Sequence, residues 1–329
     1  MPAGEEFARL AEPFRPELLV HCYRIVGSIH DAEDLVQETY LRAWRSYDSF
    51  EGRSSLRFWL YRIATSACLT ALEHRSRRML PSGLGPASDD PDRPLSLGEP
   101  GTAWVQPLPA PQSDPMTADP AAIVASRGSV RLALIAALQH LPAKQRAVLI
   151  LRDVVAWRAA EVADLLDTTP AAVNSALQRA RAHLERIAPV EEALAEPDEP
   201  GHRALLDQYM LAFENADIDA LLRLLRDDVA LEMPPNATWF AGRSAVGRFI
   251  ATKVFAGPSM ARMVRTEANG QSAVAAYFAH DGIHRAHAVQ VLTLTRTGIS
   301  RIISFNDPDL FAPFGLPVSL APARVPTSS

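Results

Sequence analysis

The sequence predicts a multidomain protein in which two all-α modules precede one α+β module. Three observations predict this class. Apolar residues recur at helical spacing up to residue 80 and again from 126 to 188, an acidic, proline-bearing stretch without periodicity separates these blocks, and short apolar runs near the C-terminus are divided by Asn-Gly, Asp-Gly and Thr-Gly. We therefore expect domains at 1–80, 126–188 and 201–317, with a linker at 81–125, a hinge at 189–200 and a disordered tail at 318–329.

Composition excludes several classes of protein. Of the 329 residues, 48% are hydrophobic and 22% charged, as in ordinary globular proteins. No apolar run approaches the roughly 18 residues that a membrane helix needs, so we expect a cytoplasmic protein that does not bind membranes. Cys22 and Cys68 lie in apolar helical stretches without metal-ligand spacing, which predicts buried thiols, no metal site and no cofactor.

Positive charge is concentrated in one block. The whole chain has a net charge of −5, whereas residues 126–188 hold nine Lys or Arg against five Asp or Glu. Because neutralisation of phosphates supplies much of the affinity for DNA, this block is the candidate DNA-binding module.

The first module centres on two helices. The first begins at Asp31, and we expect one of its faces to pack in a core through Leu35, Val36, Tyr40, Ala43 and Trp44. Asp34, Gln37 and Glu38 stand at i, i+3 and i+4, which forms an exposed patch suited to a basic partner helix. After a polar loop, a second helix from Leu56 carries aromatic residues and ends near Arg75, Arg77 and Arg78, and such residues suit unstacked bases and phosphates.

The string DAEDLVQETYLRAW followed by FWLYRIA resembles region 2 of extracytoplasmic-function (ECF) sigma factors of bacterial RNA polymerase. This resemblance implies that Asp34, Gln37 and Glu38 bind the beta-prime clamp helices of the core enzyme. It also implies contacts with the minus-10 promoter element by Phe50, Ser54, Trp59, Ile63, Ser66, Arg75, Arg77 and Arg78. The alternative for this string is a helical bundle with a solvated acidic face.

Residues 157–181 predict a helix-turn-helix motif. Thr169 is a candidate N-cap, Pro170 falls in the first turn, and Val162, Leu165 and Val173 would lock the two helices together. The outward residues of the second helix would be Asn174, Ser175, Gln178, Arg179 and Arg181, which are types that contact base edges or phosphates. The block resembles region 4 of the same sigma factors, which implies binding to the minus-35 element and the beta flap. Many members carry Arg at the positions of Asn174 and Ala176.

The linker at 81–125 contains one apolar island, residues 101–108, which would be a packing contact or an inserted segment. In sigma factors this linker threads toward the polymerase active site. A passive tether is the alternative.

The last module reads as helices followed by a curved antiparallel sheet, an α+β cone. It resembles SnoaL-like members of the NTF2-like superfamily, and sigma factors of the SigG and SigJ kind carry such a domain. Candidate lining residues for a small-molecule pocket are Tyr209, Phe213, Met233, Trp239, Phe249, His280 and His287. The segment Asp307, Pro308, Asp309, Leu310 and Phe311 matches a tail motif that relatives place against the sigma domains; a plain C-terminal cap is the alternative.

These observations predict an alternative sigma factor, which binds core RNA polymerase and promoter DNA, and whose C-terminal domain regulates it in cis. No acid–base pair stands out, so we expect no enzyme activity. The alternative hypothesis is a helix-turn-helix regulator fused to a cyclase- or hydrolase-type domain that uses His280 and His287.

Overall fold

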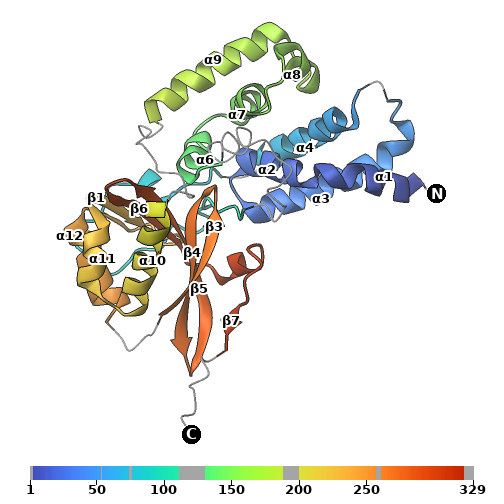
Figure 1. The fold of residues 1–329 in the computed structure, drawn as a ribbon. Coiled ribbons are helices and arrows are strands. Elements are labelled where there is room, and N and C mark those ends of the chain that lie inside the picture. The colour runs from blue at the N-terminus through green and yellow to red at the C-terminus, as the bar shows by residue number, and fades with distance from the viewer. Residues whose placement is uncertain are drawn as a thin grey trace. The chain divides into compact units, whose positions relative to one another are not determined.

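The computed structural model describes residues 3–52, 54–73, 76–110, 130–187, 200–256 and 261–321. The chain divides into two compact units, one formed by residues 1–79 with 111–189 and the other by 80–110 with 190–329 (Figure 1). Within the described ranges, no helix combines the length and the apolar character needed to cross a membrane.

The first module of the helical unit contains α1 (Ala3–Ala11), a short 3-10 helix (Glu12–Phe14), α2 (Arg15–Val26), α3 (Ile29–Ser46), a 3-10 turn (Tyr47–Ser49) and α4 (Leu56–Glu73). Gly27 has a φ of 74° and ends α2, and the Ser28 side chain accepts a hydrogen bond from Asp31 N at 3.2 Å, which begins α3. Left-handed backbone favours glycine, and serine is a preferred N-cap, so these two residues separate the helices.

The second module contains α6 (Leu132–Leu138), α7 (Ala143–Leu149), a π-helical turn (Ile150–Val154), α8 (Ala159–Leu165) and α9 (Pro170–Ile187). The sequence predicted separate domains at 1–80 and 126–188. In the structure these two modules pack against each other within one compact unit, in which α2 and α4 contact α7.

The second unit is built on one sheet with strand order β2-β1-β6-β5-β4-β3. The strands are β1 (Leu225–Glu232), β2 (Trp239–Ala241), β3 (Ala261–Ala268), β4 (Gln271–His280), β5 (Ile283–Thr295) and β6 (Gly298–Phe305). β1 and β6 are parallel, and the remaining neighbours are antiparallel. The predicted hairpins form at the expected residues, because Asn269 and Asp281 adopt φ values of 56° and 50° directly before a glycine.

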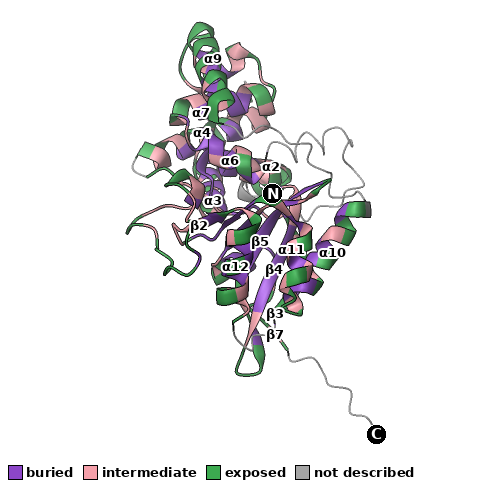
Figure 2. Cartoon of the chain, turned by 90° about the vertical axis from the view of Figure 1, so that its left-hand side faces the viewer, coloured by how far each residue is buried: buried purple, intermediate pink, exposed green. Residues whose placement is uncertain are grey.

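Helices α10 (Pro200–Glu214), α11 (Ile218–Leu224) and α12 (Arg243–Phe249) cover one face of this sheet (Figure 1), and α12 continues as a π-helical turn (Ile250–Val254). The layer between helices and strands is apolar and includes Phe213, Phe240 and Leu292, each at most 4% exposed. Figure 2 shows the buried positions concentrated on the strands below these helices. The interior of the predicted cone is therefore a packed hydrophobic core.

Residues 80–110, here called the clasp, belong to the sheet unit. At one edge of the sheet Ser88 N donates to Trp239 O at 2.8 Å, and at the other edge Asn269 N donates to Leu108 O at 2.8 Å. Val105 and Leu108 are 0% and 4% exposed, so the apolar island is a packing contact. This differs from the expected linker: residues 81–110 are bound to the C-terminal domain, and 111–125 lie outside the described residues.

The chain end also differs from the expectation. Residues Ser319–Leu320 form β7, which pairs with β5 through Arg285 and His284, so this part of the predicted disordered tail is a strand. Residues 322–329 lie outside the described residues.

Candidate nucleic-acid interface

The predicted acidic patch is exposed on α3. Ile29, Leu35 and Val36 are buried on one side of the helix, while Asp34 and Gln37 are exposed on the other. Glu38 is partly exposed and accepts a hydrogen bond from Arg42 Nε at 2.7 Å, one turn further along the helix. Because both side chains of this ion pair are more than 40% exposed, a partner can displace Arg42 at little cost.

Two apolar side chains extend this patch. Leu41 is 48% exposed and Trp44 is 55% exposed, on the same side of α3 as Gln37. The prediction that Trp44 packs in the core is wrong, because Val36, Thr39 and Ala43 already fill the buried side of the helix. We call Asp34, Gln37, Glu38, Leu41 and Trp44 the α3 stripe. The sequence signal for these two additional residues is their spacing, because Leu41 and Trp44 follow Gln37 by four and seven positions and so lie on the same side of a helix.

The predicted minus-10 residues form a partly aromatic surface on α4 and the preceding loop. The rings of Phe50 and Trp59 stack with centroids 4.8 Å apart. Trp59, Ile63 and Ser66 follow one another at i, i+4 and i+7, and none of them is fully buried. Ser54 lies in the same loop as Phe50 and is half-buried. This arrangement leaves aromatic and small polar groups beside one another, as stacking with an unpaired base requires.

The predicted arginines at the end of α4 differ in availability. Arg78 forms an ion pair with Asp31 at 2.6 Å, and both side chains are less than 20% exposed, so Arg78 holds the end of the module to the start of α3. To contact a phosphate as expected, Arg78 would have to break this ion pair with Asp31. Arg77 is exposed and lies against Met79 Sδ, and Arg75 lies outside the described residues.

The helix-turn-helix motif forms as predicted. Thr169 Oγ1 accepts a hydrogen bond from Ala172 N at 3.2 Å, and Asp167 turns the chain with a φ of 49°. Val162, Leu165, Val173 and Leu177 are buried between α8 and α9. All five predicted outward residues of α9 are exposed: Asn174, Ser175, Gln178, Arg179 and Arg181.

The two arginines of α9 are not equivalent. Arg181 makes a bidentate ion pair with Asp153, with distances of 2.9 and 2.7 Å, and this pairing raises the pKa of the guanidinium. Arg179 has no ion-pair partner among the described residues. Arg179 can bind a phosphate directly, whereas Arg181 must first leave Asp153.

Side chains of the second module lie against those of the first module in the helical unit. Trp157 stacks on Phe58 of α4 with centroids 5.0 Å apart and contacts Tyr61 at 5.2 Å. Arg146 of α7 is 4% exposed and donates to Ile25 O of α2, to Gln139 Oε1 and to two further carbonyls. Burial lowers the pKa of Arg146 to about 10, so it remains a cation at neutral pH. The contacts that join the two modules thus include a buried cation, an aromatic cluster and an exposed ion pair between Arg62 and Asp167 at 3.8 Å.

Four of the seven predicted pocket residues of the C-terminal domain come together, but in the packed core and not around a cavity. Tyr209, Phe213, Met233 and Phe249 are at most 5% exposed in the core, where the Tyr209 hydroxyl donates to Gln290 Oε1 at 2.8 Å. Trp239 instead contacts the clasp, with Nε1 donating to Gly85 O at 2.9 Å. His280 is 71% exposed in a hairpin and His287 is exposed against Phe278, so both lie outside the core that contains Tyr209.

The predicted tail motif forms a 3-10 turn, Pro308–Phe311. Asp307 caps this turn by accepting from Asp309 N at 3.0 Å. Leu310 and Phe311 are buried, and the Phe311 ring meets Tyr277 edge-on at 5.1 Å, on the sheet face opposite the helices. Pro308 and Asp309 remain exposed.

Family models match all three modules. Sigma-70 region 2 matches residues 10–78, sigma-70 region 4 matches residues 131–184, and the nuclear transport factor 2 (NTF2) domain matches residues 202–307. The first range contains the α3 stripe, and the second contains the exposed residues of α9. The third contains strands β1 to β6 with α11, α12 and most of α10.

Similar proteins agree with this order of domains. The chain is 49% identical to the ECF RNA polymerase sigma factor SigG of Mycobacterium tuberculosis over 97% of this chain and 87% of that protein. It is 30% identical to SigJ of the same organism over 73% of this chain and 70% of SigJ. The crystal structure of SigJ has the same fold, with a TM-score of 0.56 at 24% identity, and the match covers 93% of this chain and 98% of that one. The chain belongs to the ECF sigma factors of bacterial RNA polymerase.

Proposed function

We propose that the protein is an alternative sigma factor that binds core RNA polymerase through the α3 stripe and recognises a two-part promoter in the cytoplasm. The observation that carries this proposal is the α3 stripe itself. Acidic, amide and large apolar side chains share the exposed side of a helix whose other side is buried. Such a surface fits the beta-prime clamp helices of the core enzyme, because basic side chains would pair with Asp34 and Glu38 while apolar ones cover Trp44.

A charge reversal tests this interface. Changing Glu38 to Arg should weaken binding to core polymerase by about 2–5 kcal/mol if the contact is desolvated. Glu6→Arg is a matched control, because Glu6 is an exposed acid on α1 of the same module. Titration of labelled protein with core enzyme gives both affinities, and equal losses in the two variants would contradict the assignment.

Promoter recognition is assigned to two surfaces. Phe50, Trp59, Ile63 and Ser66 would capture bases that leave the duplex at the minus-10 element, which costs a few kcal/mol per base and is offset by stacking. The exposed side of α9 would enter the major groove at the minus-35 element, with Asn174 and Gln178 facing base edges and Arg179 facing a phosphate. The exposure of Ser66 and of the α9 side chains supports the assignment, as does the incomplete burial of Phe50, Trp59 and Ile63.

The C-terminal domain would regulate the sigma modules through the clasp. The clasp begins directly after the first module, and only residues 111–129 separate its end from the second module. Nineteen extended residues span at most about 65 Å, whereas the whole stretch from 80 to 129 would span roughly 170 Å. Holding the clasp therefore restricts how far the two promoter-reading modules can separate, and releasing it removes this restriction.

Several side chains could transmit this effect. Glu232 is fully buried, accepts from Ser82 N at 2.9 Å and pairs with Arg301. Thr238 Oγ1 accepts from Ser96 N at 2.9 Å, and Trp239 Nε1 donates to Gly85 O. These contacts would hold the bound state of the clasp, and an effector would act by differing in affinity between this state and a released one.

In vitro transcription with purified core polymerase tests the proposal as a whole. The full chain, a chain ending at Pro189 and a full-length Thr238→Val/Trp239→Phe variant are compared at one promoter. If the clasp restrains the modules, the last two should change promoter output in the same direction. Thr252→Val is the control, because the Thr252 hydroxyl donates to Arg248 O, one turn earlier in the same helical segment, and not to the clasp. Unchanged output in both test proteins would contradict regulation through the clasp, and absence of any transcription by the full chain and the shortened chain would contradict the sigma activity.

A further inference from the structure

A cavity of about 420 Å³ opens on the C-terminal domain, away from the packed cone interior. It lies between the N-terminus of α10, the end of α11 and the β5–β6 turn. The lining residues are Gly201, His202, Ala204, Leu205, Gln208, Arg223, Leu224, Thr295, Arg296, Thr297 and Gly298. None of these lining residues is acidic, although the chain as a whole carries a net negative charge.

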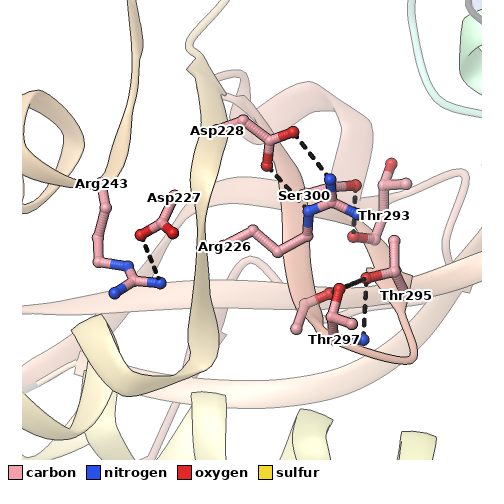
Figure 3. Close-up of polar contacts among 9 residues, drawn as sticks. Arg226, Asp227, Asp228, Arg243, Thr293, Thr295, Thr297 and Ser300 are labelled. Carbon is pink, nitrogen blue, oxygen red and sulfur yellow. Dashed lines mark hydrogen bonds and ion pairs between the residues drawn. The ribbon is translucent and has the colours of Figure 1, made fainter.

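Two cations of this lining, Arg223 and Arg296, have no partner in the part of the chain that the structure describes. Arg223 and Arg296 are exposed, and among the described residues neither forms an ion pair or hydrogen bond. The neighbouring arginines behave differently: Arg226 binds Asp228 at 2.8 Å and Arg243 binds Asp227 at 2.9 Å (Figure 3). Asp227 and Asp228 are therefore already engaged, and two uncompensated guanidinium groups remain at one cavity.

The fold brings these arginines together through a glycine. Gly298 begins β6 with a φ of 130°, and a Cβ atom there would lie 2.7 Å from Leu224 O. The β5–β6 turn, which carries Arg296, can therefore lie directly against the end of α11, which carries Arg223. In the same turn the Thr295 hydroxyl donates to Gly298 O at 2.8 Å and Thr297 N approaches Thr295 Oγ1 at 3.3 Å, so the turn is internally braced (Figure 3).

We propose that this cavity binds a small organic phosphate. Two guanidinium groups match a dianion, and Arg forms paired hydrogen bonds with phosphate oxygens. The N-terminal amides of α10 add donors with the same preference. A phosphate group alone occupies a small part of this volume, and Ala204, Leu205 and Leu224 offer apolar surface to an organic remainder. This site is additional to the polymerase and promoter interfaces.

Ligand titrations of the full-length chain test the site. Glycerol 3-phosphate is the probe, and inorganic phosphate, glycerol and succinate separate the contributions of phosphate, organic group and charge. We expect saturable binding of glycerol 3-phosphate by calorimetry and a rise in Tm, with weaker binding of inorganic phosphate and none of glycerol. Arg223→Ala and Arg296→Ala should each weaken binding by roughly ten-fold, because each removes charge-assisted hydrogen bonds.

Arg262→Ala is the matched control, because Arg262 is also exposed on this domain but lies on β3, outside the cavity. It should bind the probe as the unchanged protein does. If Arg262→Ala weakens probe binding as much as the two cavity variants do, general ionic attraction explains the binding and the proposal is overturned. Binding of succinate as strong as that of glycerol 3-phosphate would overturn the assignment to phosphate, and absence of saturable binding in a protein with native circular dichroism would overturn the site.

Discussion

The two promoter-reading surfaces, on α4 and α9, differ in how far the chain itself already occupies them. Beside the α4 surface, Trp157 stacks on Phe58, and Arg78 is held in a buried ion pair with Asp31. On α9, by contrast, Asn174, Ser175, Gln178 and Arg179 are exposed, and only Arg181 is paired. We therefore expect the proposed minus-35 surface to accept DNA directly, whereas the proposed minus-10 surface should become fully available only when the two modules separate.

The buried cation between the modules gives the largest expected effect. Arg146→Met should lower the free energy of unfolding by about 3–5 kcal/mol, because Ile25 O and the other carbonyl acceptors lose their donor in a buried site. Urea denaturation measures this loss. Arg179→Met, on the exposed side of α9, should change stability little, and similar values for the two variants would show that the modules are not joined in this way.

Base recognition by α9 is tested by exchanging its exposed residues. Asn174→Ala should relax the preference at one position of the minus-35 element by about 1–3 kcal/mol, since an amide can bond two atoms of one base. Arg179→Ala should instead weaken binding to all sequences and reduce the salt dependence. Competition binding with single-base variants of the promoter DNA measures the base preference and the overall affinity of each protein. Identical changes in the two proteins would contradict the assignment of Asn174 to base recognition and of Arg179 to phosphate contact.

The core below α4 should make the first module sensitive to acid. Burial, with smaller contributions from Arg24 and Arg57, lowers the pKa of His21 from 6.5 to about 3, and the His21 ring packs 4.7 Å from Tyr61. Between pH 6.5 and pH 3 the unfolded chain binds a proton at His21 that the folded chain does not bind. The contribution of His21 to the free energy of unfolding is therefore fully present well above pH 6.5 and is lost as the pH falls toward 3. The loss between pH 7 and pH 5.5 should be about 1 kcal/mol.

A His21→Gln variant separates this contribution from other titrating groups. Urea denaturation at both pH values should show a smaller pH dependence in the variant than in the unchanged protein. An equal dependence would mean that other groups cause the acid sensitivity.

The aromatic contact beside α4 gives the smallest effect. Trp157→Ala removes two contacts of a half-buried ring, which are worth about 0.5 kcal/mol each beyond burial. It should raise affinity for a single-stranded minus-10 oligonucleotide by roughly five-fold. Trp104→Ala, in the clasp, is the control for loss of a tryptophan. Unchanged oligonucleotide affinity after the Trp157 exchange would mean that the stack does not restrict the α4 surface.

Local patterns predicted the regular elements well. The hairpins after Ala268 and His280, the Thr169 cap and the acidic side of α3 all depend on a few neighbouring residues, and the structure confirms each of these features. Trp44 shows the limit of this approach, because helical spacing marks neighbouring positions but does not say where the buried side of a helix ends.

By itself the sequence determined the order of the modules, the turns between strands and the types of residue on α3 and α9, because caps, left-handed turns and amphipathic spacing act over a few residues. Tertiary structure alone decided that residues 80–110 bind the sheet, that Arg146 joins two modules and that Arg223 and Arg296 meet at one cavity. Ser82 and Glu232 are 150 residues apart, and their contact uses a backbone amide that any residue except proline supplies. Such contacts leave no pattern in composition or spacing, so only the folded chain reveals them.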